Sequence, residues 1–271
     1  MRIDIVSLFP EFFDAFFSHS IIKRAIEAER LSVGVTNPRD FSHNKHGQVD
    51  DTPYGGGAGM LMMAPPIFEA VESVIAQYDS ETNSAYSTDE ICDEMSLIGN
   101  PSESIRRRVI FMGPTGQPFT QEKARELATY DQLVLICGHY EGVDYRVEEH
   151  LVDEIISIGD YVLTGGELPA MVVADAVARM IPGVLGAASG AQEDSFYEPL
   201  LECPQYTKPP EFRGWGVPDV LRSGHHKNIA TWRQKEALKR TRLLRPDLLE
   251  RPLTKEEIKL LKEVIEEESR L

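Results

Sequence analysis

The stretch SIGDYVLTGGELPAM, residues 157–171, links the apolar run that precedes it to the apolar run that follows it. It contains two adjacent glycines, Gly165 and Gly166, between a predicted strand and a predicted helix. The simplest interpretation of such a pair is a tight turn, because glycine adopts positive φ at little cost. The alternative, a backbone that approaches a ligand, depends on what surrounds the stretch.

Three predicted strands in succession end in turns that contain glycine. These turns are FMGPTG (111–116), ICGHYEG (136–142) and SIGDYVLTGG (157–166). Ligands of open parallel sheets bind beyond the carboxyl ends of the strands, where three such turns can approach one another. The sequence therefore predicts a ligand site at one edge of a sheet.

The composition of these turns narrows the class of ligand. They match neither the dinucleotide pattern G-x-G-x-x-G nor the P-loop pattern GxxxxGK[ST], and they contain no lysine to contact a phosphate. Acidic side chains accompany the glycines instead, at Glu141, Asp160 and Glu167. The turns favour a ligand with positive charge over a nucleotide phosphate.

Apolar runs rich in β-branched residues alternate with helical patterns along residues 1–186. This alternation is typical of a parallel sheet covered by helices on both faces, so the predicted fold class is α/β. The expected strands are 2–9, 31–38, 108–113, 132–138 and 154–163, and the expected helices are 10–28, 65–78, 120–129, 144–150 and 167–180.

A chain of this length is expected to form two domains, or one large one. Residues 187–200 are small and polar, which predicts a linker. Residues 201–271 are expected to form an α-helical domain with helices at 228–244 and 253–271.

The overall composition is that of a globular protein, with 271 residues, 42% hydrophobic and 27% charged. No apolar run is long enough to span a bilayer, and the N-terminal residues carry acids where a signal peptide would be basic. Three widely spaced cysteines predict a reducing, cytoplasmic location without a disulfide framework. His43 and His46 are interpreted as part of a solvated loop rather than as metal ligands.

Charge is unevenly distributed along the chain, whose formal net charge is −16. Residues 206–251 contain 11 Lys and Arg against 5 Asp and Glu, whereas residues 1–205 contain 13 against 33. Residues 79–104 carry seven acids and no base, and are interpreted as a mobile acidic surface insertion. The basic segment is therefore the candidate surface for a polyanion such as nucleic acid.

Several longer motifs carry a resemblance to a known family. They are SLFPEFF (7–13), NPRDF (37–41), VDDTPYGGGAGMLM (49–62), GHYEGVD (138–144), the opening stretch, IPGVLG (181–186), EDSF (193–196), LECPQYTKP (201–209) and SGHH (223–226). In these motifs the chain resembles the bacterial tRNA (guanine-N1)-methyltransferases. The resemblance implies methyl transfer from S-adenosyl-L-methionine to N1 of guanine at position 37 of tRNA, next to the anticodon. It also implies a SPOUT fold, in which part of the sheet is tied in a deep trefoil knot.

The resemblance assigns the glycine turns to the cofactor. Adenine would take backbone hydrogen bonds in an apolar slot, and a carboxylate would meet the methionyl ammonium group. Mg²⁺ is a second cofactor that the resemblance raises, without assigning metal ligands. The residues implied for cofactor binding are Phe111, Met112, Pro114, Gly138, Tyr140, Glu141, Gly142, Ile158, Gly159, Asp160, Tyr161, Val162, Leu163, Gly165, Gly166 and Pro169.

Two catalytic residues are implied by the resemblance. Asp194, in the predicted linker, is the expected general base that removes the guanine N1 proton. Arg179, on the helix after the Gly-Gly pair, is the expected donor to guanine O6. Without the resemblance, the preferred interpretation would be a helix-capping linker acid for Asp194 and a surface ion pair for Arg179.

The resemblance also implies partners. Members of the family are homodimers in which the linker and C-terminal domain of one subunit complete the site of the other. tRNA and a second copy of the chain are therefore expected, and a membrane is not. The expected tRNA contacts, for which a solvated basic helix face is the alternative, are His225, Lys227, Arg233, Lys239 and Arg240.

Two other functions are alternatives to this interpretation. A non-catalytic RNA-binding protein with a vestigial pocket would be expected to lack Arg179 or Asp194, and both are present. A SPOUT methyltransferase that acts on rRNA or on ribose would share the fold, but methylation of ribose requires no acid to deprotonate a base nitrogen. Residues 79–104 are longer than the resemblance leads us to expect, and Glu202 stands where an aspartate is expected, so neither has an assigned role.

Overall fold

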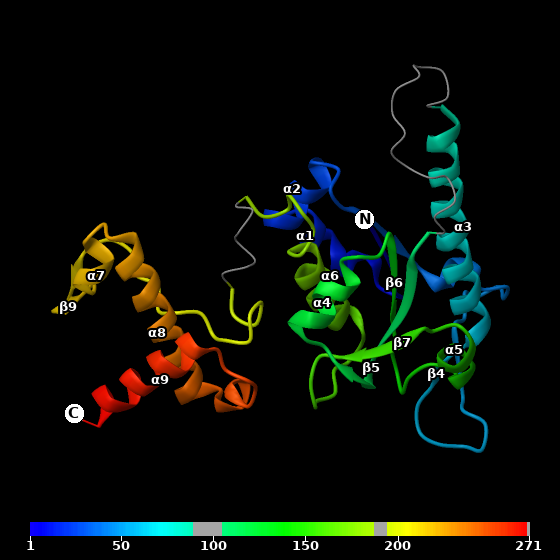
Figure 1. The fold of residues 1–271 in the computed structure, drawn as a ribbon. Helices are drawn as coiled ribbons and strands as arrows, with labels where there is room; N and C mark the ends of the chain where they lie inside the picture. Colours follow the sequence, from blue (N-terminus) through cyan, green and yellow to red (C-terminus); the bar gives the residue numbers. More distant parts are fainter. Residues whose placement is uncertain (89–104, 187–193, 270–271) are drawn as a thin grey trace. The chain divides into compact units, whose positions relative to one another are not determined.

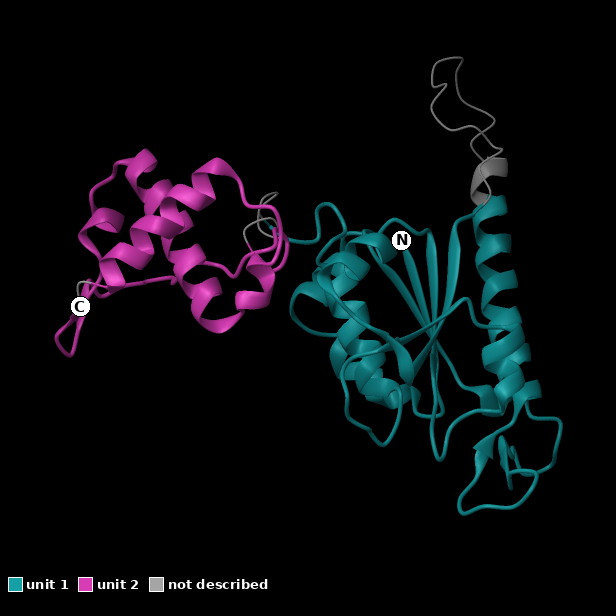
Figure 2. Ribbon diagram, turned by 60° about the horizontal axis from the view of Figure 1, so that its bottom comes forward, with its two compact units in different colours: residues 1–186 teal, residues 187–271 magenta. Residues whose placement is uncertain are grey.

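The computed structural model describes residues 1–88, 105–186 and 194–269 (Figure 1). The chain divides into two compact units, Met1–Gly186 and Ala187–Leu271, which Figure 2 colours separately. The division falls at the residue where the sequence places the end of the first domain, while the roles of the two domains stay predictions. Most of the predicted acidic insertion and the first half of the predicted linker lie outside the described residues.

A five-stranded parallel sheet forms the centre of the first unit. Its strand order is β2-β1-β6-β5-β7, and every neighbouring pair is parallel, which confirms the predicted α/β class. The strands are β1 (Arg2–Val6), β2 (Ser32–Thr36), β5 (Arg107–Pro118), β6 (Gln132–Cys137) and β7 (Glu154–Ser157). A short antiparallel pair, β3 (Asp50–Asp51) and β4 (Leu61–Met62), is connected by residues 52–60, the glycine-rich loop.

The central strand β6 is buried on both faces of the sheet. Leu133, Leu135 and Cys137 belong to one core cluster, and Val134 and Ile136 belong to the other. Successive side chains of a strand point to opposite faces, so a strand buried on both faces has a continuous apolar run. This is the physical reason for the run QLVLIC in the sequence.

Helices cover both faces of this sheet (Figure 1). The first cluster is completed by side chains of α2, α4 and α6, and the second by side chains of α3 and α5. The bounds of the helices in this unit are α1 (Asp14–Phe17), α2 (Ser20–Glu27), α3 (Ala64–Thr88), α4 (Gln121–Leu127), α5 (Tyr145–His150) and α6 (Glu167–Ala178).

The single helix predicted over residues 10–28 is wrong. A 3-10 turn (Pro10–Phe13) leads into α1, and the chain is interrupted before α2 begins. His19 is extended and Ser20 has a φ of 56°, a backbone conformation that a continuous helix excludes. The interruption lets Phe13 and Ile22 both reach the core from short helices.

Helix α3 is longer than the predicted 65–78. It continues to Thr88, so residues 79–88, which were assigned to the mobile acidic insertion, are part of this helix and that assignment is wrong for them. Polar contacts accompany this part of the helix: Asp79 pairs with Arg107, and Glu81 accepts a hydrogen bond of 2.8 Å from Gln77. An apolar stripe is the signal from which helices are predicted, and here polar pairs replace it.

Strands β5 and β7 depart from the prediction where their glycine turns begin. The strand expected to end at residue 113 continues to Pro118, with a register shift in which both Met112 and Gln117 pair with Ile156. The residues between them form a bulge in the strand. β7 ends at Ser157, so residues 158–163, which were expected to extend it, form an irregular segment.

The described part of the second unit contains three α-helices, α7 (Asp219–Arg222), α8 (His226–Leu244) and α9 (Lys255–Glu268). Leu238 of α8 and Leu260 and Val264 of α9 are buried where these helices pack. The sequence missed a two-stranded hairpin, β8 (Glu211–Phe212) and β9 (Trp215–Gly216).

The N-terminus of α9 is held by a set of short polar contacts. Thr254 caps the helix in a capping box, in which Glu257 accepts a hydrogen bond of 2.7 Å from the Thr254 backbone N–H. Arg251 donates to the same carboxylate at 2.6 Å. The Arg251 hydrogen bond is the main cause that lowers the pKa of Glu257 from 4.5 to about 2.

We expect Glu257→Gln to lower the free energy of unfolding of the second unit by about 1–3 kcal/mol at pH 7, because a buried charge-assisted contact is lost. The folded-state pKa is depressed, so the stabilisation is present above pH 4.5 and is lost as the pH falls toward 2. The variant should lack this acid-dependent loss. Both tryptophans, Trp215 and Trp232, lie in this unit, so their fluorescence during urea unfolding reports on it.

The matched control is Glu256→Gln, which neutralises the exposed neighbouring acid. It should change the free energy of unfolding by no more than about 0.5 kcal/mol. Equal effects of the two substitutions would contradict the role given to Glu257.

Candidate functional site

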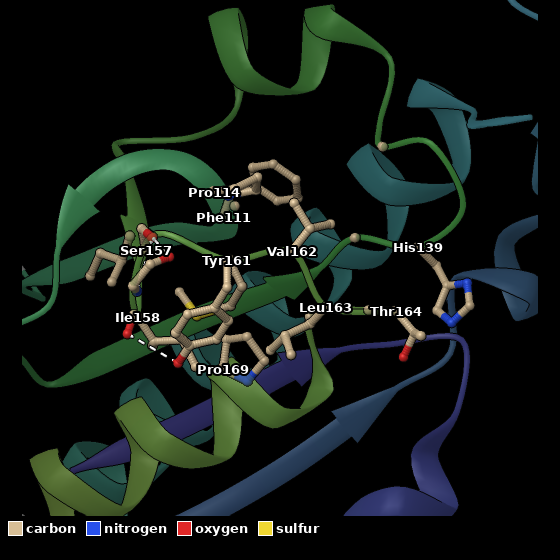
Figure 3. A pocket seen from close by; sticks show the side chains of 18 of the residues that line it. Phe111, Pro114, His139, Ser157, Ile158, Tyr161, Val162, Leu163, Thr164 and Pro169 are labelled. Carbon is tan, nitrogen blue, oxygen red and sulfur yellow. Dashed lines mark hydrogen bonds between the residues drawn. The ribbon is translucent and has the colours of Figure 1, made fainter.

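A pocket lies at the carboxyl ends of β6, β5 and β7, which are neighbours in the sheet (Figure 3). Its walls come from the bulge of β5, the turn after β6 and the segment between β7 and α6. Of the residues predicted to bind the cofactor, only the exposed Asp160 does not line it. The sequence missed five lining residues that neighbour predicted ones in the same segments: Gly113, His139, Ile156, Ser157 and Thr164.

Gly166 is needed for space and not for backbone conformation. Its φ is −82°, and Gly165 also lacks a positive φ, so the interpretation of the pair as a positive-φ turn is wrong. A Cβ on Gly166 would lie 2.6 Å from Cα of Cys137 and 2.9 Å from N of Gly138. The Gly166 N–H donates to the Gly138 carbonyl at 2.9 Å, so the start of α6 lies directly on the end of β6.

A buried polar contact lies beneath this junction. Glu167, the first residue of α6, is 4% exposed and accepts a hydrogen bond of 2.8 Å from the fully buried Ser7 hydroxyl. Ser7 directly follows β1, so the contact ties the helix to a second strand. Burial, followed by the charge of Glu167, raises the pKa of the Cys137 thiol. Glu167 therefore faces the protein interior, and it does not line the pocket.

The turn after β6 packs against the glycine-rich loop that precedes β4. Glu141 N–H donates to the carbonyl of Met60 at 3.1 Å, and Met62 N–H donates to that of Gly142 at 2.9 Å. A Cβ on Gly59, whose φ is +85°, would lie 2.4 Å from Cγ of Glu141. The loop thus supports the turn, and Glu141 is the one carboxylate among the described residues that line the pocket.

The segment after β7 presents apolar side chains along the pocket (Figure 3). Val162 is 84% exposed, and Tyr161 and Leu163 beside it are also exposed. The turn is held by Ser157, whose hydroxyl accepts from the Gly159 N–H at 3.2 Å. Exposed apolar side chains at the edge of a pocket are typical of a surface that a ligand or a partner covers.

The two predicted catalytic residues belong to different units. Arg179 is the C-cap residue of α6 in the first unit. Asp194 lies in the second unit, where it lines a pocket with Glu202, with Arg233 and with the buried Cys203. The prediction that joins Arg179 and Asp194 in one site is therefore not tested within either unit.

The five predicted RNA contacts are exposed at the start of α8 and along it. Arg233 and Arg240 are seven residues apart and share one helix face, on which Arg233 lines the Asp194 pocket and Arg240 donates to the Glu202 carbonyl at 3.4 Å. Lys227 and Lys239 lie on other faces of the helix. The structure therefore groups the two arginines and separates the two lysines from them.

Neither a metal-binding cluster nor a membrane-spanning helix is found among the described residues. They contain no group of three or more His, Cys, Asp or Glu side chains placed to hold a metal ion, so Mg²⁺ stays a prediction of the resemblance. No helix among residues 1–88, 105–186 and 194–269 has the length and apolar character needed to cross a membrane.

We expect Gly166→Ala to lower the free energy of unfolding of the first unit by about 1–3 kcal/mol, because the new methyl group would meet backbone atoms that cannot rotate away. Thermal unfolding followed by calorimetry measures the change. Gly186→Ala is the control, since a Cβ there would have no atom within 4 Å. An unchanged transition for Gly166→Ala would contradict the close approach of α6 to β6.

Comparisons with known proteins identify the family of this chain. Residues 1–251 match the family model described as tRNA (Guanine-1)-methyltransferase TrmD. A tRNA (guanine-N(1)-)-methyltransferase of Desulforamulus reducens is 54% identical over 97% of this chain and 95% of its own. Proteins of the same name from Brevibacillus brevis and from Dehalococcoides mccartyi strain CBDB1 are 52% and 50% identical over at least 99% of each chain. The chain belongs to the tRNA (guanine-1)-methyltransferase family.

Proposed function

We propose that the chain transfers the methyl group of S-adenosyl-L-methionine to N1 of guanine in tRNA, at position 37. Family membership supports the reaction and the class of substrate. The observation that carries the proposal is the pocket at the carboxyl ends of β6, β5 and β7, which combines nearly all the residues implied for the cofactor. The trefoil knot of the SPOUT fold is part of the same proposal.

The pocket fits the cofactor chemically. Gly138, Gly142 and Gly166 line the pocket without side chains that would obstruct a ligand, and apolar side chains such as Leu163 provide a slot for adenine. Glu141 offers a carboxylate to the methionyl ammonium group. When bound there, the cofactor supplies an electrophilic methyl group on a positively charged sulfur.

Asp194 and Arg179 act on the guanine in this proposal. The Asp194 carboxylate accepts the N1 proton, which leaves on N1 the electron pair that would take the methyl group as the methyl–sulfur bond breaks. Negative charge develops on O6, and the Arg179 guanidinium donates hydrogen bonds to it. Both residues are partly buried, which supports a site more sheltered than open solvent.

A homodimer completes the site in this proposal. Apolar side chains of the first unit are exposed next to the pocket, at Val162, and on α6, at Leu168 and Val172. A second copy that covers these side chains would remove them from water. Asp194 of one subunit and Arg179 of the other would then act on the same guanine.

The reaction itself is tested with methyl-labelled S-adenosyl-L-methionine and two tRNA transcripts that carry guanine or adenine at position 37. We expect 1-methylguanosine from the first transcript only, identified by nucleoside mass spectrometry after digestion. A methylated product from both transcripts would contradict position 37. Absence of 1-methylguanosine from these transcripts and from ribosomal RNA would contradict the reaction.

We expect Asp194→Asn to reduce single-turnover methyl transfer by about 10²-fold or more, with cofactor affinity unchanged, because the amide keeps the shape and cannot accept the proton. Calorimetric titration measures that affinity. Glu198→Gln, at another acid of the same pocket, is the control and should stay within a few-fold of the unsubstituted chain. A rate for Asp194→Asn within a few-fold of the unsubstituted chain would remove the base from this residue.

Mixing inactive Asp194→Asn and Arg179→Ala subunits tests the dimer. If the two residues act from different subunits, each heterodimer contains one intact site and one site that lacks both groups, so activity returns. No recovery after verified subunit exchange would place both residues in the same subunit.

A further inference from the structure

The β8–β9 hairpin is a small structure with a defined register. Phe212 pairs with Trp215, and the two residues between them form the whole turn. Arg213 and Gly214 have φ values of 52° and 83°, the pair of positive angles that a two-residue type I′ turn requires. The turn therefore sets the two aromatic residues opposite each other.

Both aromatic side chains are exposed. Trp215 is 70% exposed and Phe212 is 56% exposed, with ring centroids 6.3 Å apart and planes inclined by 50°. The Arg213 guanidinium carbon lies 5.1 Å from the Phe212 ring centroid. Residues 205–216 are exposed without exception, so these rings do not contribute to the core of the unit.

Positive side chains surround the two rings in the sequence. Lys208 precedes β8, Arg213 forms the turn and Arg222 ends the short helix that follows, and all three are exposed. The hairpin belongs to residues 206–251, the segment in which Lys and Arg exceed Asp and Glu. Exposed rings interleaved with cations are the means by which proteins bind unpaired nucleotides, whose bases stack on rings while phosphates meet cations.

We propose that the β8–β9 hairpin binds unpaired nucleotides of the RNA substrate by stacking bases on Trp215 and Phe212, with Arg213 at a neighbouring phosphate. The proposal rests on the proposed function, because it takes as ligand the single-stranded loop that holds the target guanine. It adds a binding site to the positions on α8 that the sequence predicts.

The chain has two tryptophans, which makes base stacking directly measurable. In a Trp232→Phe background, Trp215 is the only fluorescent indole, and a stacked base quenches it. The probes are an RNA stem-loop of the anticodon arm and a duplex of the same stem without a loop. We expect the stem-loop to quench the fluorescence and the duplex to leave it nearly unchanged.

Affinity for the same stem-loop tests how much the rings contribute. We expect Trp215→Ala to raise its Kd by about 5- to 150-fold, the range for loss of one stacked base, and Trp215→Phe to retain most of the affinity. The control is Leu243→Ala, which removes a 76% exposed apolar side chain from α8. KM for tRNA should rise in Trp215→Ala, while kcat and cofactor affinity stay unchanged.

The outcomes separate this proposal from the proposed function. Absence of quenching, together with an unchanged Kd for Trp215→Ala and Phe212→Ala, would overturn the hairpin site and leave methyl transfer intact. Quenching by the stem-loop in a protein that forms no 1-methylguanosine would overturn the reaction and support the hairpin site. A Trp215→Ala variant that dissociates in sedimentation, while its Kd for RNA is unchanged, would assign the rings to a protein contact instead.

Discussion

The packing of Gly166 on the backbone of Cys137 and Gly138 is the constraint on which the candidate site depends. Any side chain at position 166 would meet backbone atoms, so α6 can begin in contact with β6 only at a glycine. The hydrogen bond from Ser7 to Glu167 joins the same turn of the helix to the end of β1, the strand that lies next to β6 in the sheet. With α6 attached to two strands, the segment that precedes it lies across the strand ends and forms a wall of the pocket.

The wall that β5 contributes to the pocket also depends on a glycine that packs against backbone atoms. A Cβ on Gly116 would lie 2.4 Å from the carbonyl of Ile155, so the returning part of the β5 bulge packs directly on the backbone of β7. Close backbone packing brings three chain segments together and leaves mainly peptide groups and apolar side chains to meet a ligand. Glu141 is the exception, as the carboxylate among the described lining residues. A site with this lining suits the cationic cofactor of the proposed function, because it offers a shaped apolar slot and one negative charge.

The sequence predicts the parallel sheet and the location of the pocket, because continuous apolar runs and glycine turns both leave local signals. It does not predict why Gly166 is needed, since the close approach to β6 depends on a contact between segments distant in the chain. The extension of α3 was missed for a different reason: ion pairs such as Asp79 with Arg107 stabilise it without an apolar stripe. The β8–β9 hairpin was missed because its Arg-Gly turn is a weaker signal than Asn-Gly.

The two faces of α8 differ in how their positive charges are used. On the face toward α9, Lys235 contacts Glu267 at 2.6 Å and Arg242 pairs with Glu268, so acids of the same unit largely neutralise these cations. Arg233 lies on the other face, at the pocket that Asp194 lines, and is exposed. A phosphate that binds there would hold RNA next to the carboxylate proposed as the base. RNA binding and proton removal would then depend on one unit, while the methyl donor belongs to the other, so neither unit alone would have the groups for the reaction.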